Sequence, residues 1–328
     1  MVAIADKDAV TKLYMQDNAT FADAFNFLLY DGEQVIRPEQ LRPLDTSAIT
    51  LPYATGEKPS PVQKYRDVLK SVVAMTDDHA AYLLLGIENQ SQIHYAMPVR
   101  NLLYDAIQYA VQVDRIASAH KTNKDTPETK AEFLSGFFST DKLLPVITMT
   151  LYFGPDEWTA PKDLHSMLSA NEHILKFVDN YHLHLIAPAD IADKDFEKFH
   201  TELCPALRFV KYSKNMEQLK ALLRSDNTFR SISKRTADML NIVTNAQLHY
   251  PDGKERVDMC EAIEGIRNEG IAIGLAKGRA EGKAEGRTEG MLELLIGLVK
   301  DGLLSVEDAA VRIGMSAAEF KKKMEQNP

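Results

Sequence analysis

Two carboxylates at the ends of a predicted β-hairpin are the residues best placed to do chemistry. The runs DVLKSVVAM (67–75) and AAYLLLGIE (80–88) are apolar and partly β-branched, and the four residues between them, TDDH, have turn composition. With a four-residue loop, residue 75 pairs with residue 80, and this register places Asp67 opposite Glu88. Directly opposed like charges are destabilising unless a cation offsets them. The spacing therefore predicts a divalent-cation site, with Mg²⁺ bound by Asp67 and Glu88.

Such a site would suit hydrolysis of a phosphate ester, because Mg²⁺ polarises a phosphate and lowers the pKa of an attacking water. Period-two alternation puts Gln90 on the same strand face as Glu88, where its amide could orient the water or the phosphate. The alternative is that Asp67 and Glu88 are unrelated, exposed strand ends, which is the common fate of carboxylates.

The elements around the hairpin predict an α/β fold. Neither hairpin strand alternates cleanly, so we expect both to be central in a sheet that is covered by helices on both faces. An amphipathic helix precedes them at 21–29 and ends near Gly32. Further strands are expected at 143–154 and 181–188, and residues 196–249 have helical composition.

A second helix is expected to begin at Pro98 and to continue through VRNLLYDAIQYAVQ. Its apolar side, expected to face the core, consists of Val99, Leu102, Leu103, Ala106, Ala110 and Val111. On the opposite side, Arg100, Tyr104 and Gln108 follow an i, i+4, i+8 pattern. This polar stripe either binds phosphate beside the metal site or is simply solvated.

Composition limits the partners and the compartment. No run of about 18 apolar residues occurs, and the N-terminus has no secretory h-region, so we expect no membrane span and a cytoplasmic protein. Cys204 and Cys260 are far apart, which excludes a cysteine-based zinc site. The 38 Lys and Arg against 47 Asp and Glu give a net charge of -9. Any contact with DNA must therefore come from a local basic patch.

From residue 265 the chain changes character. Glycines stand at 265, 270, 274, 278, 282, 286 and 290, several of them preceded by Glu. This segment is either a helix that presents a glycine groove to a partner helix, and so makes a homo-oligomer, or a flexible charged tether. Ser305 with Asp308 and Ser316 with Glu319 fit capping boxes, which predicts two short helices in the tail. They are either a DNA-reading helix-turn-helix or a packing module.

Three sequence blocks carry a resemblance to a known family: YRDVLK (65–70), LLLGIENQSQIHYAMPVRNLLYDAIQY (83–109) and LPVITMTLYFG (144–154). They resemble the recombination-promoting nucleases, also labelled YhgA-like transposases, of the PD-(D/E)XK nuclease superfamily. The resemblance covers about residues 20–155 and fades toward 250. It implies a restriction-endonuclease-like mixed sheet core flanked by helices, followed by a C-terminal Gly/Glu-repeat helical segment and a short two-helix tail.

The resemblance also implies roles for individual residues. Asp67 corresponds to the aspartate of the family's second core strand, and Glu88 with Gln90 to its ExQ motif, so Asp67, Glu88 and the Asn89 carbonyl would bind the metal. Gln90 stands where the wider superfamily has lysine. The absence of that lysine removes one means of stabilising charge in the transition state. Glu33 is the candidate for an auxiliary acid near the first helix.

Taken together, the sequence predicts a nuclease domain at 1–255, a Gly/Glu/Lys-rich segment at 256–300 and a two-helix tail at 301–328. The predicted function is a metal-dependent endonuclease that hydrolyses double-stranded DNA in recombination or transposition, with Arg100 and Tyr104 as DNA contacts. The alternative is a catalytically impaired relative that acts as a DNA-binding or self-associating scaffold. The missing lysine and the net charge of -9 favour this alternative.

Overall fold

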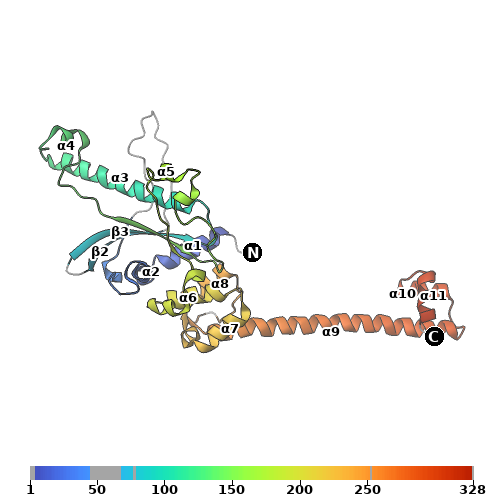
Figure 1. Ribbon diagram of the computed structural model, residues 1–328. Coiled ribbons are helices and arrows are strands. Elements are labelled where there is room, and N and C mark those ends of the chain that lie inside the picture. The colour runs from blue at the N-terminus through green and yellow to red at the C-terminus, as the bar shows by residue number, and fades with distance from the viewer. Residues whose placement is uncertain (1–3, 45–67, 77–78, 252, 327–328) are drawn as a thin grey trace. The chain divides into compact units, whose positions relative to one another are not determined.

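The computed structural model describes the chain except for residues 1–3, 45–67, 77–78, 252 and 327–328. It has two compact units, Met1–Ala262 and Ile263–Pro328. The first unit is a mixed α/β structure in which helices cover both faces of a sheet (Figure 1). The predicted α/β class is therefore confirmed.

The main sheet has five strands in the order β1-β2-β3-β4-β5. Strands β1, β2 and β3 pair antiparallel, whereas β4 and β5 run parallel to β3. Both hairpin strands are thus interior to the sheet, as predicted. The strands are β1 (Arg42–Pro43), β2 (Val68–Thr76), β3 (His79–Gln90), β4 (Val146–Tyr152) and β5 (His184–Ile186), and a separate small sheet pairs β6 (Ile232–Ser233) with β7 (Arg256–Val257).

The register of the hairpin is the one that the sequence predicts. Val68 pairs with Ile87 and Met75 pairs with Ala80. The ladder also includes Thr76 with His79, one pair closer to the turn than a four-residue loop allows. Asp67 lies outside the described residues, so the register is confirmed as far as its neighbour, residue 68.

Two helices cover one face of the sheet, and a third covers the other face (Figure 1). On the first face lie α1 (Ile4–Met15) and α2 (Asn18–Tyr30), the latter being the helix predicted at 21–29. Helix α2 begins at an Asp17 cap that accepts the Thr20 N–H, and it ends where Asp31 adopts a left-handed conformation.

Helix α3 (Met97–Asn123) covers the other face. It is rotated about its axis relative to the prediction, so that its predicted apolar side faces away from the sheet. Val99, Leu102 and Ala106, from the expected apolar side, are exposed. Residues from the polar side of the helix are buried instead, and they include Asn101, Tyr104 and Asp105. The prediction was wrong because it assumed that the sheet offers an apolar surface, whereas β3 and β4 present polar groups to this helix.

The rest of the first unit supports the sheet and its helices. Helix α8 packs against α1, and α6 packs against both α2 and α8. The helical composition of 196–249 is confirmed by α6 to α8. The remaining helices are α4 (Lys130–Ser135), α5 (Glu172–Leu175), α6 (Leu203–Tyr212), α7 (Met216–Ser225) and α8 (Lys234–Thr244).

The second unit contains most of the long helix α9 (Met259–Lys300), followed by α10 (Val306–Ile313) and α11 (Ala317–Gln326). The two predicted capping boxes are present: Ser305 accepts the Asp308 N–H, and Ser316 and Glu319 bond reciprocally. Gly314 closes α10 in a left-handed conformation. The three helices share a small apolar core formed by Leu292, Leu295, Ile296, Ala309, Ala310 and Phe320. In the part of the chain that the structure describes, no helix is long and apolar enough to span a membrane.

Candidate functional site

The face of β3 and β4 beneath α3 carries polar groups in an otherwise apolar sheet. Glu88 on β3 is directly beside Thr150 on β4 in the parallel ladder, and Gly86 is beside Thr148. Residues that pair across two strands point to the same face, and alternation adds Gln90 to it. Because helix α3 lies over this face, its side chains meet Glu88 in a space closed from solvent.

Glu88 is completely buried, and its charge is balanced by Arg100 from α3. The Arg100 Nη2 atom lies 3.0 Å from Glu88 Oε2, and the Arg100 side chain keeps 31% of its surface exposed while that of Glu88 keeps 0%. Arg100 Nε also donates to the Tyr104 hydroxyl, at 3.0 Å. A buried carboxylate without a cation would be very costly, so Arg100 stabilises Glu88 while it remains in contact with water.

Further along α3, two buried polar side chains bond to β4. Asn101 Nδ2 donates to Thr150 Oγ1 at 3.0 Å, beside the Glu88 position. One helical turn on, Asp105 accepts hydrogen bonds from the hydroxyls of Thr148 and Tyr181. Asn101 and Asp105 therefore attach α3 to the sheet through hydrogen bonds where apolar packing would be usual.

Sequence reasoning missed this second set of residues, although two signals were present. Thr148 and Thr150 are two residues apart in a strand that is otherwise apolar, which places both hydroxyls on one face. Asn101 and Asp105 are four residues apart on a helix, and so lie on one side of it. Neither signal alone shows that the two pairs face each other.

The opposite face of the sheet holds a different buried charge, Lys70. Its Nζ donates to the Gln16 carbonyl at 2.7 Å and to Asn18 Oδ1 at 2.6 Å, and it lies 4.7 Å from the centroid of the Phe21 ring. Burial lowers the pKa of Lys70 to about 8. Lys70 pairs with Leu85 on β3, which places it on the face opposite Glu88.

The other predicted site residues are not all brought together. Gln90 is partly exposed, and its Nε2 donates to the Asn89 carbonyl at 3.0 Å, so this carbonyl already has a donor. Glu33 is exposed beyond the end of α2, the helix that packs on the Lys70 face. Asp67 is outside the described residues. Among the residues that the structure does describe, no group of three or more His, Cys, Asp and Glu is arranged to hold a metal.

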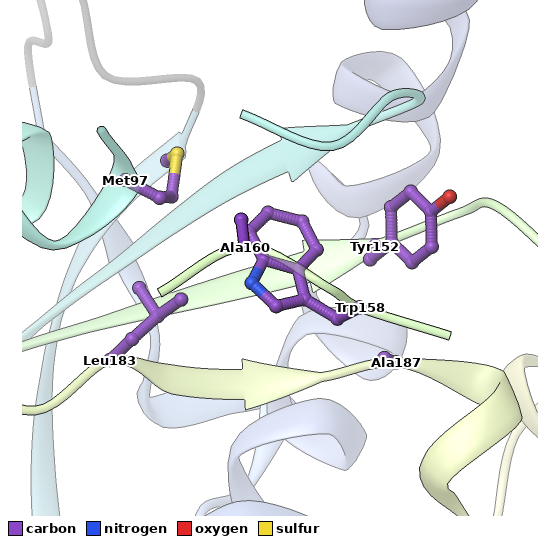
Figure 2. Close-up of a cluster of buried hydrophobic side chains, with 6 residues drawn as sticks. All are labelled: Met97, Tyr152, Trp158, Ala160, Leu183 and Ala187. Atoms are coloured by element: carbon purple, nitrogen blue, oxygen red, sulfur yellow. The ribbon is translucent and has the colours of Figure 1, made fainter. Parts of the chain in front are cut away.

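An apolar cluster lies near Gln90 and the first turn of α3 (Figure 2). The Trp158 indole lies at its centre, and the Tyr152 ring meets it edge-on with centroids 5.4 Å apart. Tyr152 is the ladder partner of Gln90, and Met97 begins α3. The cluster, which also contains Ala160, Leu183 and Ala187, therefore fixes the start of α3 relative to the carboxyl ends of β3 and β4.

A cavity of about 540 Å³ opens next to these strand ends. Its lining includes Ser91, directly after β3, and Tyr152 at the end of β4. Lys7 and Lys214 also line it, Lys7 donating to the Val243 carbonyl at 2.7 Å. In open α/β sheets the carboxyl ends of parallel strands are the usual place for ligands. The cavity and the Glu88 position thus adjoin the same edge of the sheet.

A family comparison agrees with this reading of the core. The family model described as "Putative transposase, YhgA-like" matches residues 62–239, slightly more than half of the 328-residue chain. The chain belongs to this family. The match includes Glu88, α3 and the polar face of β4, and it ends before α9. No curated protein and no solved structure matches the chain. The family's description points to a role connected with transposition.

Proposed function

We propose that the protein is a metal-dependent DNA endonuclease, built on a restriction-endonuclease-like core, that hydrolyses phosphodiester bonds of duplex DNA in transposition or recombination. The observation that carries this proposal is Glu88, a completely buried carboxylate whose cationic partner reaches solvent. A protein that needed only a stable core would place an apolar side chain there, since buried ion pairs contribute little to stability. Membership in a transposase-like family supports DNA as the partner.

The residues around Glu88 fit a divalent cation. The guanidinium of Arg100 already occupies a position 3.0 Å from the carboxylate, so this place accommodates positive charge. A carboxylate is the hard oxygen ligand that Mg²⁺ prefers. The residues that would hold the ion are Glu88 and, by the family resemblance, Asp67, which is outside the described residues.

A bound divalent cation would supply the polarisation of the phosphate and the activation of a water molecule. The chain's own side chains would do the rest. Arg100, already partly in water, would move from Glu88 to a phosphate oxygen, and the Tyr104 hydroxyl would keep accepting its Nε–H. Gln90, at the solvent end of the same face, would orient the water through its amide.

Nicking of a supercoiled plasmid tests this function. The purified protein would be incubated with Mg²⁺, Mn²⁺, Ca²⁺ or EDTA, beside Asp67→Ala and Glu88→Ala variants and a Glu39→Ala control, which removes an exposed acid at another position. We expect metal-dependent nicking that both site variants lose and the control retains. Absence of nicking with every metal, or nicking that survives both substitutions, would reject the endonuclease.

The alternative is a scaffold that associates with itself through α9, and one observation favours it. Leu294 is exposed on the side of α9 opposite Leu292 and Ile296 of the small core, and Met291 is also exposed. Large apolar side chains left exposed on a helix can mark a face that a partner covers. In the same helix, nothing lies within 4 Å of the Cβ position of glycines 274, 278, 282, 286, 290 and 297. We propose a second copy of the chain as the occupant of this face.

The charges of the repeat select one orientation for that pair. Glu281 and Glu285 each precede a glycine, and Lys283 and Arg287 each follow one, so acidic and basic rows flank the glycine row on opposite sides. In a parallel two-fold pair, the acidic row of one helix faces the basic row of the other. In an antiparallel pair, like charges would face each other.

Light scattering on the full chain tests the scaffold alternative. We expect a dimer that Leu294→Glu converts to a monomer, whereas Leu303→Glu, at an exposed leucine beyond α9, leaves the dimer intact. A monomeric wild-type protein, or a dimer that Leu294→Glu leaves unchanged, would reject pairing through this face.

A further inference from the structure

The far end of α3 has an unusual arrangement of charge. Residues 120–142, here called the α3 tip, contain four lysines and four acidic residues in a chain whose net charge is -9. Three of the acids have internal partners: Asp125 and Asp141 pair with His120, and Glu132 is buried and accepts backbone N–H groups. By contrast, the lysines are all exposed, and within the described chain no ion pair involves Lys121, Lys124, Lys130 or Lys142. The tip therefore presents four lysines without ion-pair partners to solvent, beside the exposed acids Asp125 and Glu128, and its formal net charge is zero with His120 neutral.

The tip is also rigid, because its internal contacts attach α4 to α3. The His120 ring stacks on Phe138 with centroids 3.8 Å apart, and its two nitrogens lie 2.7 Å from Asp125 and 2.9 Å from Asp141. These carboxylates raise the pKa of His120, which favours its positive charge. Glu132 completes a capping box at the start of α4.

On this base, α4 presents two large apolar side chains to solvent. Phe133 is 72% exposed and its neighbour Leu134 is 73% exposed. Single exposed apolar residues are ordinary, but an adjacent pair beside four exposed lysines resembles a binding feature more than incidental surface. Proteins that bind the minor groove combine such residues with Lys and Arg, inserting Phe or Leu between base steps and thereby kinking the duplex.

We propose that the α3 tip is a second DNA contact, in which its lysines bind phosphates and Phe133 and Leu134 enter the minor groove. The inference rests on the proposed function, because it takes duplex DNA as the partner. Arg100 at the Glu88 site and His120 at the tip are 20 residues apart on one helix, a distance of about 30 Å. That distance corresponds to about 9 base pairs, so a duplex along α3 would contact both places within one helical turn.

The distribution of charge favours DNA over a protein partner at the tip. Four exposed lysines that make no ion pair within the described residues are available to a phosphate backbone, while two of the four acids of the tip, Glu132 and Asp141, are turned inward. Other exposed apolar residues in this unit lack this setting. Phe177, which is 79% exposed, is flanked by Lys176 and by the acid Asp179 and serves as a matched control.

The test measures DNA binding in EDTA, so that it does not depend on cleavage. Fluorescence anisotropy with a 30-base-pair duplex at several salt concentrations would compare the full-length protein with three variants: Lys121→Gln/Lys130→Gln, Phe133→Ser/Leu134→Ser and Phe177→Ser. Energy transfer between dyes at the two duplex ends would report bending. All substituted side chains are exposed, and circular dichroism would verify that each variant is folded.

We expect the lysine variant to reduce the slope of log affinity against log salt by about 1.8, which is about 0.9 for each lost phosphate contact. The apolar variant should weaken binding by about tenfold and abolish bending at an unchanged salt slope, and Phe177→Ser should match wild type.

If wild type binds DNA and the tip variants bind and bend it equally well, the tip inference alone is overturned. If the apolar variant alters self-association and leaves DNA affinity unchanged, the tip is a protein contact. If wild type does not bind duplex DNA, the tip inference and the proposed function both fail.

Discussion

Lys70 and Glu88 are charged residues buried on opposite faces of the central sheet, and their charges are satisfied in different ways. Lys70 is held by Gln16 and Asn18, at the junction of α1 and α2 beneath the sheet. Glu88 pairs with the long side chain of Arg100, which remains 31% exposed. A lysine bound to fixed internal acceptors stabilises one structure, whereas a carboxylate whose counter-ion can leave is available to another cation. If the proposed function is right, the accessibility of the partner, rather than burial alone, distinguishes a structural charge from a functional one.

The largest expected effect is the loss of catalysis in Glu88→Gln. This substitution keeps the shape of the side chain but removes the charge that would bind the metal, so nicking should fall by about 10³-fold or more, equivalent to about 4 kcal/mol. The free energy of unfolding, measured with urea, should change by less than about 1 kcal/mol, because an amide replaces a carboxylate of equal size. A large loss of stability with retained nicking would make Glu88 the structural charge.

Lys70→Ala should have the opposite result. It removes two hydrogen bonds to Gln16 and Asn18 and the contact with Phe21, so the free energy of unfolding should fall by about 2–4 kcal/mol. The folded fraction should nick plasmid DNA at the wild-type rate, which single-turnover assays on stabilised samples at low temperature would measure. A strong loss of nicking by folded protein would contradict the division between the two faces.

A smaller effect is expected for Arg100→Met. The substitution removes the guanidinium that lies 3.0 Å from the buried Glu88 carboxylate, and stability in EDTA should decrease by about 1–3 kcal/mol, less than for a fully buried pair because Arg100 is partly exposed. Mn²⁺ should restore this stability, since the ion can take the place of the guanidinium. Thermal unfolding with and without Mn²⁺ would measure the restoration. Mn²⁺ should not restore the stability of Lys70→Ala, because that substitution removes a side chain on the opposite face of the sheet.

The smallest effect concerns pH. Burial lowers the pKa of Lys70 to about 8 from an ordinary value of 10.5. Between these values the unfolded chain binds more protons than the folded one, so the stability contributed by Lys70 rises with pH across this window and is lowest below pH 8. The unfolding free energy of wild type minus that of Lys70→Ala should increase by up to about 2 kcal/mol from pH 7.5 to 9.5. A flat or falling difference would show that Lys70 stays charged when folded.

Much of the framework follows from local patterns in the sequence. The hairpin register is determined by the lengths of two apolar runs and the turn between them, because a shift of one residue would exchange the two faces of each strand. Helix α2, the two tail helices and their caps follow from short-range signals such as Asp17, Ser305 and Gly314. These features depend on residues only a few positions apart, so the sequence is sufficient to predict them.

The candidate site was only partly predictable. Glu88, Arg100 and Tyr104 could be named from their spacing, yet the expectation that α3 turns its apolar side inward would have placed Arg100 and Tyr104 away from the sheet. Hydrophobic periodicity predicts the side that is usually buried, and it fails where the surface beneath the helix is itself polar.

What the sequence by itself determined is therefore helices α2 and α3, the four strands β2 to β5, the tail helices, the hairpin register and the candidate acid Glu88, whereas α1, α4 and α5 were not predicted. Only the tertiary structure decided that α3 rotates its polar side toward β4, bringing Arg100 to Glu88 and Asp105 to Thr148 and Tyr181. The physical reason is that a buried polar group must find a partner, and the partners of these groups lie up to 76 residues away along the chain. No local pattern encodes such a match, which becomes visible only when the elements are packed together.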